Sequence, residues 1–574
     1  MWLKYMKKYV DKYWKGFSLA IICLTVEALC DLMQPTIMSK IVDIGVADKN
    51  MDYIVKKGLL MLGITAIGAV GASGRNILSG TVSQNFSAEL REDLFKKVQS
   101  FSFESIDKFE RSSLITRLTN DVTQIQNFVN GLMRIAVKAP IICIGSIIMA
   151  SRLNLRLSSI IFVVILIVVI LIFLNMSIGY PYFIKVQQAL DRVNSVMREF
   201  LSGVRVVKAF NRSDYENKRF KTSNEELGAL STRAMQVMSI FSPGINLVVN
   251  VGIVSVLWIG GLYVNSGNMK VGQIIAFTNY MTQILYSIMI ISAVFNTFVR
   301  SKASANRISE IFEEKNSSDS DRGVLKFKGR GKIEFENVNF SYANGHKVIE
   351  DISFTCIPGE TVGIIGATGS GKSTLVNLIP RFYNVTSGII KIDGVDIKDM
   401  DEKMLRDRIA LVPQETILFT GSVLENIRWG KEGASLEEVK EAAEIAEVNE
   451  FISKFPEKYD TRLGQGGVNF SGGQKQRVSI ARALVKRPTI LILDDCTSAV
   501  DAATETRIRK KLKKYSNYLT CIIIAQKISS VISADKIIVL NDGKLAGMGS
   551  HEDLIKSCQV YKDIFLSQVG KGKV

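Results

Sequence analysis

The chain has 574 residues, 47% hydrophobic and 22% charged, which excludes a single compact domain and predicts a membrane part joined to a soluble part. Its seven cysteines stand singly, which argues against a disulfide framework or a zinc site and favours a reducing cytoplasm. The net charge of +17 could suit nucleic acid, but the apolar segments below favour an anionic membrane surface, so no nucleic-acid partner is expected.

The first fifteen residues mix five aromatic side chains with five lysines. This pattern predicts an interfacial elbow helix over residues 1–15 that lies along the membrane before the first span. The alternative is a solvated basic tail, in which the aromatic side chains would be exposed to water without benefit.

Six stretches are long and apolar enough to cross about 30 Å of hydrocarbon as helices. The connections after the second and fourth stretches are long, polar and basic, so the positive-inside rule places them and both termini in the cytoplasm. They lack glycine and proline clusters, which predicts that the helices continue below the membrane. Arg152 and Arg156, in the short third connection, run against the rule. The predicted transmembrane domain covers residues 16–305, with stretches at 17–44, 58–78, 128–150, 157–179, 240–264 and 274–298.

Two acidic residues stand in the first of these stretches. Glu27 and Asp31 are four residues apart and so share one face of a helix. Burying an acidic side chain at mid-membrane costs about 2.5 to 3.5 kcal/mol on insertion scales, so each should face water or a partner. Two interpretations stay open: a substrate path that prefers cations, or a helix position at the outer end that is exposed to water.

Residues 306–331 are polar and rich in Ser and Asp, which predicts a linker. Beyond it, short strand-like runs alternate with helical ones, as in an α/β domain over residues 332–574. Here a strand-like run leads into a glycine-rich loop that fits the pattern of a phosphate-binding loop. Its backbone N–H groups would hold the phosphates of a nucleoside triphosphate, while Lys372 reaches the β and γ phosphates and Ser373 offers a hydroxyl to Mg²⁺. The loop consists of Gly366, Ala367, Thr368, Gly369, Ser370, Gly371, Lys372, Ser373 and Thr374.

Four further stretches carry groups that suit a nucleotide site. Asp494 ends a buried strand, where its carboxylate can hold the Mg²⁺ that Ser373 touches. Gln414 follows another strand and can reach the metal or the attacking water, and Tyr342 can stack on a base. A helix opens after Phe470 with a second anion site, whose residues are Ser471, Gly472, Gly473 and Gln474.

With these motifs in this order, the chain resembles an ATP-binding cassette (ABC) exporter half-transporter. The resemblance implies a polytopic α-helical membrane domain of six transmembrane helices (type IV, or type I exporter, fold) fused to an α/β P-loop NTPase domain. It also implies roles: Tyr342 stacks on adenine, residues 366–374 form Walker A, Gln414 the Q-loop, Ser471 to Gln474 the signature motif, Asp494 the Walker B carboxylate, and Ser498 to Asp501 the D-loop. Residues 117–122 and 207–210 resemble the intracellular loops whose short coupling helices touch the nucleotide-binding domains.

The family also implies a geometry. Two nucleotide-binding domains hold two ATP molecules head to tail, each between one chain's Walker A and the other chain's signature. The chain would therefore need a second ABC half as partner, and ATP hydrolysis would take place mainly in the composite site shared with it. ATP and Mg²⁺ are the implied cofactors.

Two positions depart from the family pattern. Asp495 stands where the hydrolytic glutamate is expected, and Gln526 stands where the switch histidine is expected. Aspartate is shorter by about one C–C bond, roughly 1.5 Å, and glutamine cannot carry a proton or a positive charge. The chain's own site, with Asp495, Gln526 and Gln414 as its catalytic residues, is expected to bind ATP and hydrolyse it poorly. This favours a heterodimer with a partner that has Glu and His there; a homodimer with two slow sites is the alternative.

The functional prediction is half of an ATP-driven efflux pump of the multidrug type, which exports drugs or other amphipathic compounds across the bacterial cytoplasmic membrane. Its partners would be the second half, membrane lipid and an amphipathic small molecule. A lipid or peptide exporter and a non-transporting, ATP-gated regulatory subunit are the alternatives.

Overall fold

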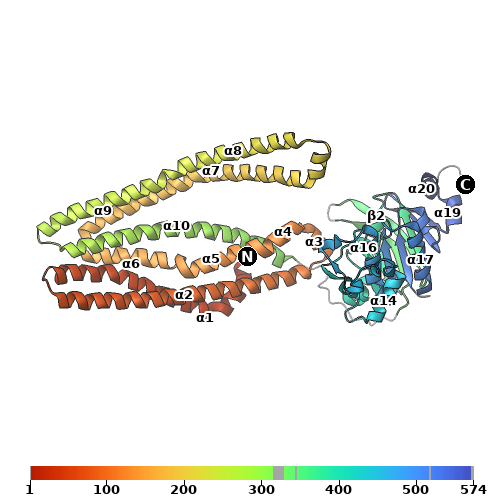
Figure 1. Cartoon of the computed structure of the whole chain (residues 1–574), viewed down its shortest axis with the longest axis horizontal. Coiled ribbons are helices and arrows are strands. Elements are labelled where there is room, and N and C mark those ends of the chain that lie inside the picture. Colours follow the sequence, from red (N-terminus) through yellow and green to blue (C-terminus); the bar gives the residue numbers. More distant parts are fainter. Residues whose placement is uncertain (1, 315–328, 343–344, 516–518, 570–574) are drawn as a thin grey trace. The chain divides into compact units, whose positions relative to one another are not determined.

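The computed structural model describes residues 2–314, 329–342, 345–515 and 519–569 (Figure 1). The chain divides into two compact units. Unit 1 comprises Met1–Gln99 and Glu110–Glu314, and unit 2 comprises Ser100–Phe109 and Lys315–Val574. Most of the predicted linker lies outside the described residues, and its first part continues the last helix of unit 1 to Glu313.

Unit 1 contains six helical segments that are long and apolar enough to cross a membrane. Each predicted stretch falls inside one of them, which confirms the six-helix prediction. The segments are Lys7–Val46, Met51–Gln99, Arg111–Leu153, Leu155–Ala209, Ser213–Asn265 and Val271–Glu313. Their elements are α1 (Trp2–Lys40), η1 (Ile41–Val46), α2 (Met51–Gln99), α4 (Arg111–Thr116), η2 (Arg117–Asp121), α5 (Val122–Gly131), η3 (Leu132–Ala136), α6 (Lys138–Leu153), α7 (Leu155–Ala209), α8 (Ser213–Ser239), α9 (Phe241–Asn265) and α10 (Val271–Glu313).

Several of these helices are longer than a membrane is thick. Helix α7 has 55 residues, a length of roughly 80 Å at 1.5 Å per residue. Hydrocarbon about 30 Å thick cannot cover it, so the polar part of α7 continues as helix outside the membrane. Helices α8 and α9 run back along α7 (Figure 1).

Residues 2–15, predicted as an interfacial elbow helix, are the N-terminal part of α1. Helix α1 runs from Trp2 to Lys40, and side chains of its N-terminal part bind α2. The Tyr9 hydroxyl donates to Asp93 at 2.7 Å and the Tyr13 hydroxyl to Glu89 at 2.9 Å, while each carboxylate also pairs with a lysine of α1. These bonds attach the N-terminal part of α1 to α2.

Close packing against α1 explains why the second span contains several glycines in place of larger apolar residues. A Cβ on Gly71 would lie 3.0 Å from the carbonyl oxygen of Cys23, and one on Gly68 would lie 3.2 Å from the Cβ of Cys30. Helix α2 therefore packs against the backbone of α1 at Gly71 and against the Cys30 side chain at Gly68, as membrane helices do where small residues line the contact.

The two acidic residues of α1 have basic partners on other helices. Glu27 is buried, with 7% of its surface exposed, and its carboxylate lies 2.5 Å from Lys138 Nζ and 3.2 Å from Arg75 Nε. The contact with Arg75 Nε is an ion pair only, because its angles do not meet those of a hydrogen bond. Asp31 lies 2.9 Å from Lys138. These carboxylates are neutralised by basic side chains of two other helices, because an unpaired buried charge would be too costly.

Unit 2 is built on a six-stranded sheet in the order β12-β11-β3-β10-β9-β6. A second sheet has the order β2-β1-β4-β5, and β7 and β8 form a small pair. The strands are β1 (Ile333–Ser341), β2 (Lys347–Cys356), β3 (Thr361–Gly366), β4 (Ser387–Ile392), β5 (Val395–Asp396), β6 (Ile409–Val412), β7 (Gly421–Ser422), β8 (Arg462–Leu463), β9 (Ile490–Asp494), β10 (Thr520–Ile524), β11 (Lys536–Asn541) and β12 (Lys544–Gly549).

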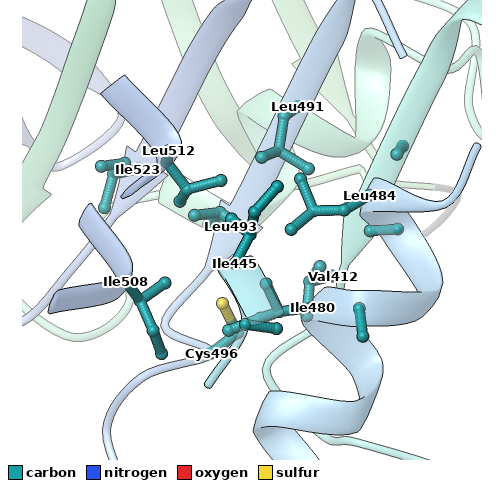
Figure 2. Packing of buried hydrophobic residues seen from close by; sticks show 14 of the residues in the cluster. Val412, Ile445, Ile480, Leu484, Leu491, Leu493, Cys496, Ile508, Leu512 and Ile523 are labelled. Atoms are coloured by element: carbon teal, nitrogen blue, oxygen red, sulfur yellow. The ribbon is translucent and has the colours of Figure 1, made fainter. Parts of the chain in front are cut away.

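The central sheet is buried on both faces. Along β9, Leu491 and Leu493 point into one hydrophobic cluster, and Ile490 and Ile492 point into another, as the two-residue period of a strand requires. Figure 2 shows the first cluster, in which residues of helices α14, α16 and α17 pack against β9 and β10. The helices of unit 2 are α3 (Phe103–Lys108), α11 (Lys372–Leu378), α12 (Glu402–Arg408), α13 (Val423–Arg428), α14 (Leu436–Ile445), α15 (Asn449–Ile452), α16 (Gly472–Leu484), α17 (Ala502–Tyr515), α18 (Ile528–Val531), α19 (His551–Ser557) and α20 (Gln559–Val569), with short 3-10 turns η4 (Ile397–Asp399), η5 (Lys458–Asp460) and η6 (Gln465–Gly467).

Candidate nucleotide-binding site

Four strands of the central sheet end at one edge, and the predicted site residues follow them there. Strands β3, β10, β9 and β6 are parallel neighbours, with Ile524 of β10 level with both Ile364 and Asp494. Because parallel strands bring their carboxyl ends to the same edge, the residues after them meet. They line a pocket of about 220 Å³, whose lining consists of Val348, Thr368, Gly369, Gly371, Lys372, Ser373, Thr374, Gln414, Asp494, Asp495, Ile524 and Gln526.

The phosphate-binding loop has the backbone conformation that its glycines allow. Gly369 and Gly371 have φ of 85° and 92°, values that favour glycine, and a Cβ on Gly371 would lie 3.0 Å from the carbonyl oxygen of Val348. The Lys372 ammonium donates to the carbonyl oxygens of Gly366 at 3.0 Å and Ala367 at 2.7 Å. The lysine is thus folded over the loop, and α11 points its N-terminus at the same space.

The oxygen atoms around this loop suit the binding of a magnesium ion together with the phosphates of a nucleotide. The Ser373 hydroxyl donates to Asp494 at 3.1 Å, and the buried Ser370 hydroxyl has no hydrogen-bond partner among the described residues. Burial raises the pKa of Asp494 and lowers the pKa of Lys372. A bound cation would offset the cost of the buried carboxylate, and one carboxylate plus hydroxyl and phosphate oxygens is the set that Mg²⁺ commonly takes. Ser373, Asp494 and Gln414 would hold it.

Asp495 and Gln526 contact each other at the floor of this pocket. The Gln526 side-chain amide donates to the Asp495 carboxylate at 3.1 Å, and the Asp495 backbone N–H donates to the carbonyl oxygen of Ile524 at 3.0 Å. Asp495 has φ of 45°, a left-handed conformation that Asp adopts more readily than most residues. Burial raises the pKa of this carboxyl group. The carboxylate is therefore held by a neutral amide.

Tyr342 lies beside the phosphate loop. Its hydroxyl is 3.1 Å from the hydroxyl of Thr374, and its ring meets those of Phe340 and Tyr383 edge to face. These contacts fix the ring at the mouth of the loop, where the predicted stacking on a base would take place.

The predicted signature and D-loop residues do not line this pocket. Ser471 caps α16, where its hydroxyl accepts from the Gln474 N–H at 3.3 Å, and Asp501 caps α17 by accepting from the Thr504 N–H at 2.9 Å. That hydrogen bond lowers the pKa of Asp501. Both groups are exposed, and so is Gly472, the first residue of α16.

Gln476 links these two segments, a role that we did not predict. It is 6% exposed; its amide donates to Ser498 at 3.3 Å and accepts from the Ala499 N–H at 3.0 Å. The signature helix and the D-loop are therefore held together as one piece. The only signal in the sequence was its place two residues after Gln474, on the buried side of a helix.

Sequence reasoning also missed a short helix that packs in unit 2. The ring of Phe103, the first residue of α3, stacks on Phe382 at a centroid distance of 4.3 Å, and the Tyr383 hydroxyl donates to Asp107 at 2.6 Å. Residues 117–122, which resemble an intracellular loop, belong to unit 1, where Asp121 binds Ser304 and Arg307 of α10. The usable signal was Ser102, which caps α3.

The fold and this site together define a membrane protein with a fused ATP-binding domain of the P-loop type. Two family models match the chain: the ABC transporter transmembrane region over residues 17–288 and the ABC transporter domain over residues 349–498. The chain belongs to the ABC transporter family and is homologous to bacterial ABC exporters.

Relatives match nearly the whole chain. An uncharacterized ABC transporter ATP-binding protein of Bacillus subtilis, YfiB, is 40% identical over 96% of both chains. An ATP-dependent lipid A-core flippase of Syntrophus aciditrophicus is 32% identical over 97% of this chain and 93% of its own. A solved structure, a bacterial Atm1-family ABC exporter with ATP bound, superposes with a TM-score of 0.82 at 25% identity and covers 98% of this chain and 99% of its own.

Proposed function

We propose that the chain is one half of an ATP-driven exporter of amphipathic compounds in the bacterial cytoplasmic membrane, with both termini in the cytoplasm. The lysines and arginines of the two long polar segments support this orientation. A relative named as a lipid flippase supports an amphipathic cargo. The proposed domain limits are residues 16–305 for the membrane part and 332–574 for the ATP-binding part.

The contact between Asp495 and Gln526 carries the finer proposal, that the chain's own site binds ATP and hydrolyses it poorly. A general base must lie within about 2.6–3.2 Å of the water it polarises. The Asp495 side chain is one carbon shorter than that of glutamate, and one of its oxygens already accepts from Gln526. Loss of a well-placed base costs about 10² to 10⁴ in rate. The ATP-binding groups Lys372, Ser373 and Asp494 are all present.

A second half is needed because the signature residues Ser471 to Gln474 do not line the chain's own pocket. They lie at the start of α16, where Ser471 and Gly472 are exposed, and would complete the site of the other half, which is the one expected to hydrolyse ATP efficiently. An intact signature beside two replaced catalytic groups supports a heterodimer, and a homodimer with two slow sites is the other outcome.

The test restores the expected groups with Asp495→Glu and Gln526→His together. The partner's own base is replaced by alanine, so that only this chain's site can turn over. We expect ATP turnover to rise at least about 10-fold, since a placed base contributes 10² or more. Adding Lys372→Ala must abolish the gain. If turnover does not rise, the two replaced groups do not limit hydrolysis and the proposal is wrong.

A further inference from the structure

Unit 1 contains a cavity of about 740 Å³ that no part of the ATP site uses. Residues of α2, of the segment from α5 to α6 and of α10 line it. Its wall is mostly apolar, with Phe128, Ile142, Ile290 and Val294 among the lining residues. A cavity of this size in a membrane domain can accept an amphipathic molecule of moderate size.

The charges on the cavity wall are all of one sign. Arg75, Arg134 and Lys138 line it, and its described lining includes no Asp or Glu. Two of these basic residues are already paired: Glu27 binds Arg75 and Lys138, and Asp31 binds Lys138. Two carboxylates thus match two of the three cations, and one positive charge remains.

Arg134 carries that remaining charge. Within the part of the chain that the structure describes, no carboxylate lies within ion-pair distance of it, and its side chain is exposed. Its own carbonyl oxygen accepts from Arg75 at 2.6 Å, which fixes the backbone there. An unpaired guanidinium inside a membrane domain is costly unless water or a ligand solvates it.

The position of Arg134 along its span suits a headgroup. It lies in η3, which a turn at Val137 joins to α6, and it stands 19 residues before Leu153, the last residue of α6; at about 1.5 Å per residue this is roughly 28 Å. The hydrocarbon of a membrane is about 30 Å thick, so Arg134 lies close to the opposite headgroup region from Leu153. An amphiphile in the leaflet nearest Arg134 places its polar group at the depth of Arg134 and its apolar part toward the middle of the membrane.

We propose that this cavity binds amphiphiles with an anionic headgroup, such as a phosphate, carboxylate or sulfonate, at the guanidinium of Arg134, with the apolar part against Ile142, Ile290 and Val294. This names the substrate class and so rests on the proposed export function. It replaces the interpretation of a cation-preferring path, because Glu27 and Asp31 are already paired with Arg75 and Lys138 and do not line the cavity themselves. The ligand is either an anionic membrane lipid or a free anionic compound, since both present the same chemistry.

The test measures binding to the full chain, co-purified with its second half in nanodiscs of phosphatidylcholine. The lipid probes are phosphatidylglycerol and phosphatidylcholine with the same tail fluorophore. The free probes are pyrenebutanoate and pyrenebutyl-trimethylammonium, which differ only in their charged end. We expect phosphatidylglycerol, pyrenebutanoate or both to bind more tightly than the matched neutral or cationic probe. Binding by the lipid alone assigns the site to lipid, and binding by pyrenebutanoate alone assigns it to free compounds.

Variants then assign the preference to the residue. Arg134→Gln should weaken the anionic probe by at least about 10-fold, the range of one lost charge-assisted hydrogen bond, and leave the other probe unchanged. Arg134→Lys should retain part of the preference. Arg152→Gln is the matched control, because Arg152 is exposed on the same span and does not line the cavity. The inference is overturned if Arg134→Gln lowers the affinity for both probes equally. It is also overturned if the natural protein does not bind the anionic probe more tightly than the matched probe.

ATP turnover separates this inference from the proposed function. If neutral or cationic probes stimulate turnover and anionic ones do not, export stands and the anionic site is wrong. If none of the four probes alters turnover while anionic probes bind through Arg134, the site stands and the proposal of transport fails.

Discussion

Asp494, Asp495 and Lys372 place two negative charges and one positive charge in a small pocket where four strands of the central sheet end. Burial raises the pKa of both carboxyl groups and lowers that of the lysine, because water solvates the charged form of each group poorly in this pocket. In the structure the lysine satisfies two loop carbonyls, Gly366 and Ala367. Bound phosphates would offer it a better, charged partner.

The role of Lys372 can be measured without hydrolysis. Lys372→Ala should weaken ATP binding at least about 10-fold, since hydrogen bonds to charged groups contribute about 1.5–3 kcal/mol. Equilibrium binding of a fluorescent ATP analogue to the purified transporter checks this. Lys403→Ala is the control, because Lys403 is an exposed lysine of α12 outside the pocket. Equal binding by both variants would contradict the role of Lys372.

At the scale of elements, the ATP-site residues could be placed from the sequence because each follows a buried strand by a fixed, short spacing. Parallel pairing of these strands then brings Gln414, Asp494 and Gln526 to one edge of the central sheet, regardless of the conformation of the loops between the strands. The membrane unit offered no such rule. Arg75, Arg134 and Lys138 come from spans whose rotation depends on packing, so their common cavity was not predicted, nor was the pairing of Glu27.

The continuity of α1 with its N-terminal turns was missed for a related reason. The aromatic and basic pattern of residues 1–15 fits a membrane interface, and its actual partners, Asp93 and Glu89, stand some eighty residues later on α2. A local pattern cannot show a distant acidic partner. Similarly, α3 has only six residues, which are too few to show the hydrophobic period of a helix, so its contact with Phe382 could not be expected.

The close packing of α1 on α2 makes a prediction about stability. Gly71→Val should lower the thermal midpoint of the purified transporter, because its Cβ would lie 3.0 Å from the Cys23 carbonyl and overpacking costs about 1–3 kcal/mol. Gly63→Val, at a glycine of the same helix with open space around it, is the matched control. An equal shift for both variants would mean that the α1–α2 contact is not what the glycine preserves.

At the scale of the whole molecule, the chain leaves α2 after Gln99, forms α3 and returns to unit 1 at Glu110. Because α3 packs in unit 2 but is joined by the chain to α2 and α4 of unit 1, it is suited to couple ATP-driven movement to the membrane helices. Its contacts are Phe103 on Phe382 and Asp107 with Tyr383.

Loss of the contact between Phe103 and Phe382 should uncouple transport from ATP binding. Phe103→Ala should leave ATP binding within about 2-fold and reduce transport into vesicles by about 10-fold, since burying an aromatic ring against another contributes 0.5–1.5 kcal/mol beyond its area. Phe95→Ala, at an exposed ring of α2, is the control. Transport that survives Phe103→Ala would show that coupling runs elsewhere.

The most direct measurement is ATP turnover of the co-purified pair with Asp495→Ala in this chain, compared with loss of the corresponding carboxylate in the second half. The account predicts that Asp495→Ala leaves turnover nearly unchanged, because this site hydrolyses little, and that the change in the partner abolishes it. If Asp495→Ala alone abolishes turnover, Asp495 is a working base and the asymmetric assignment is wrong.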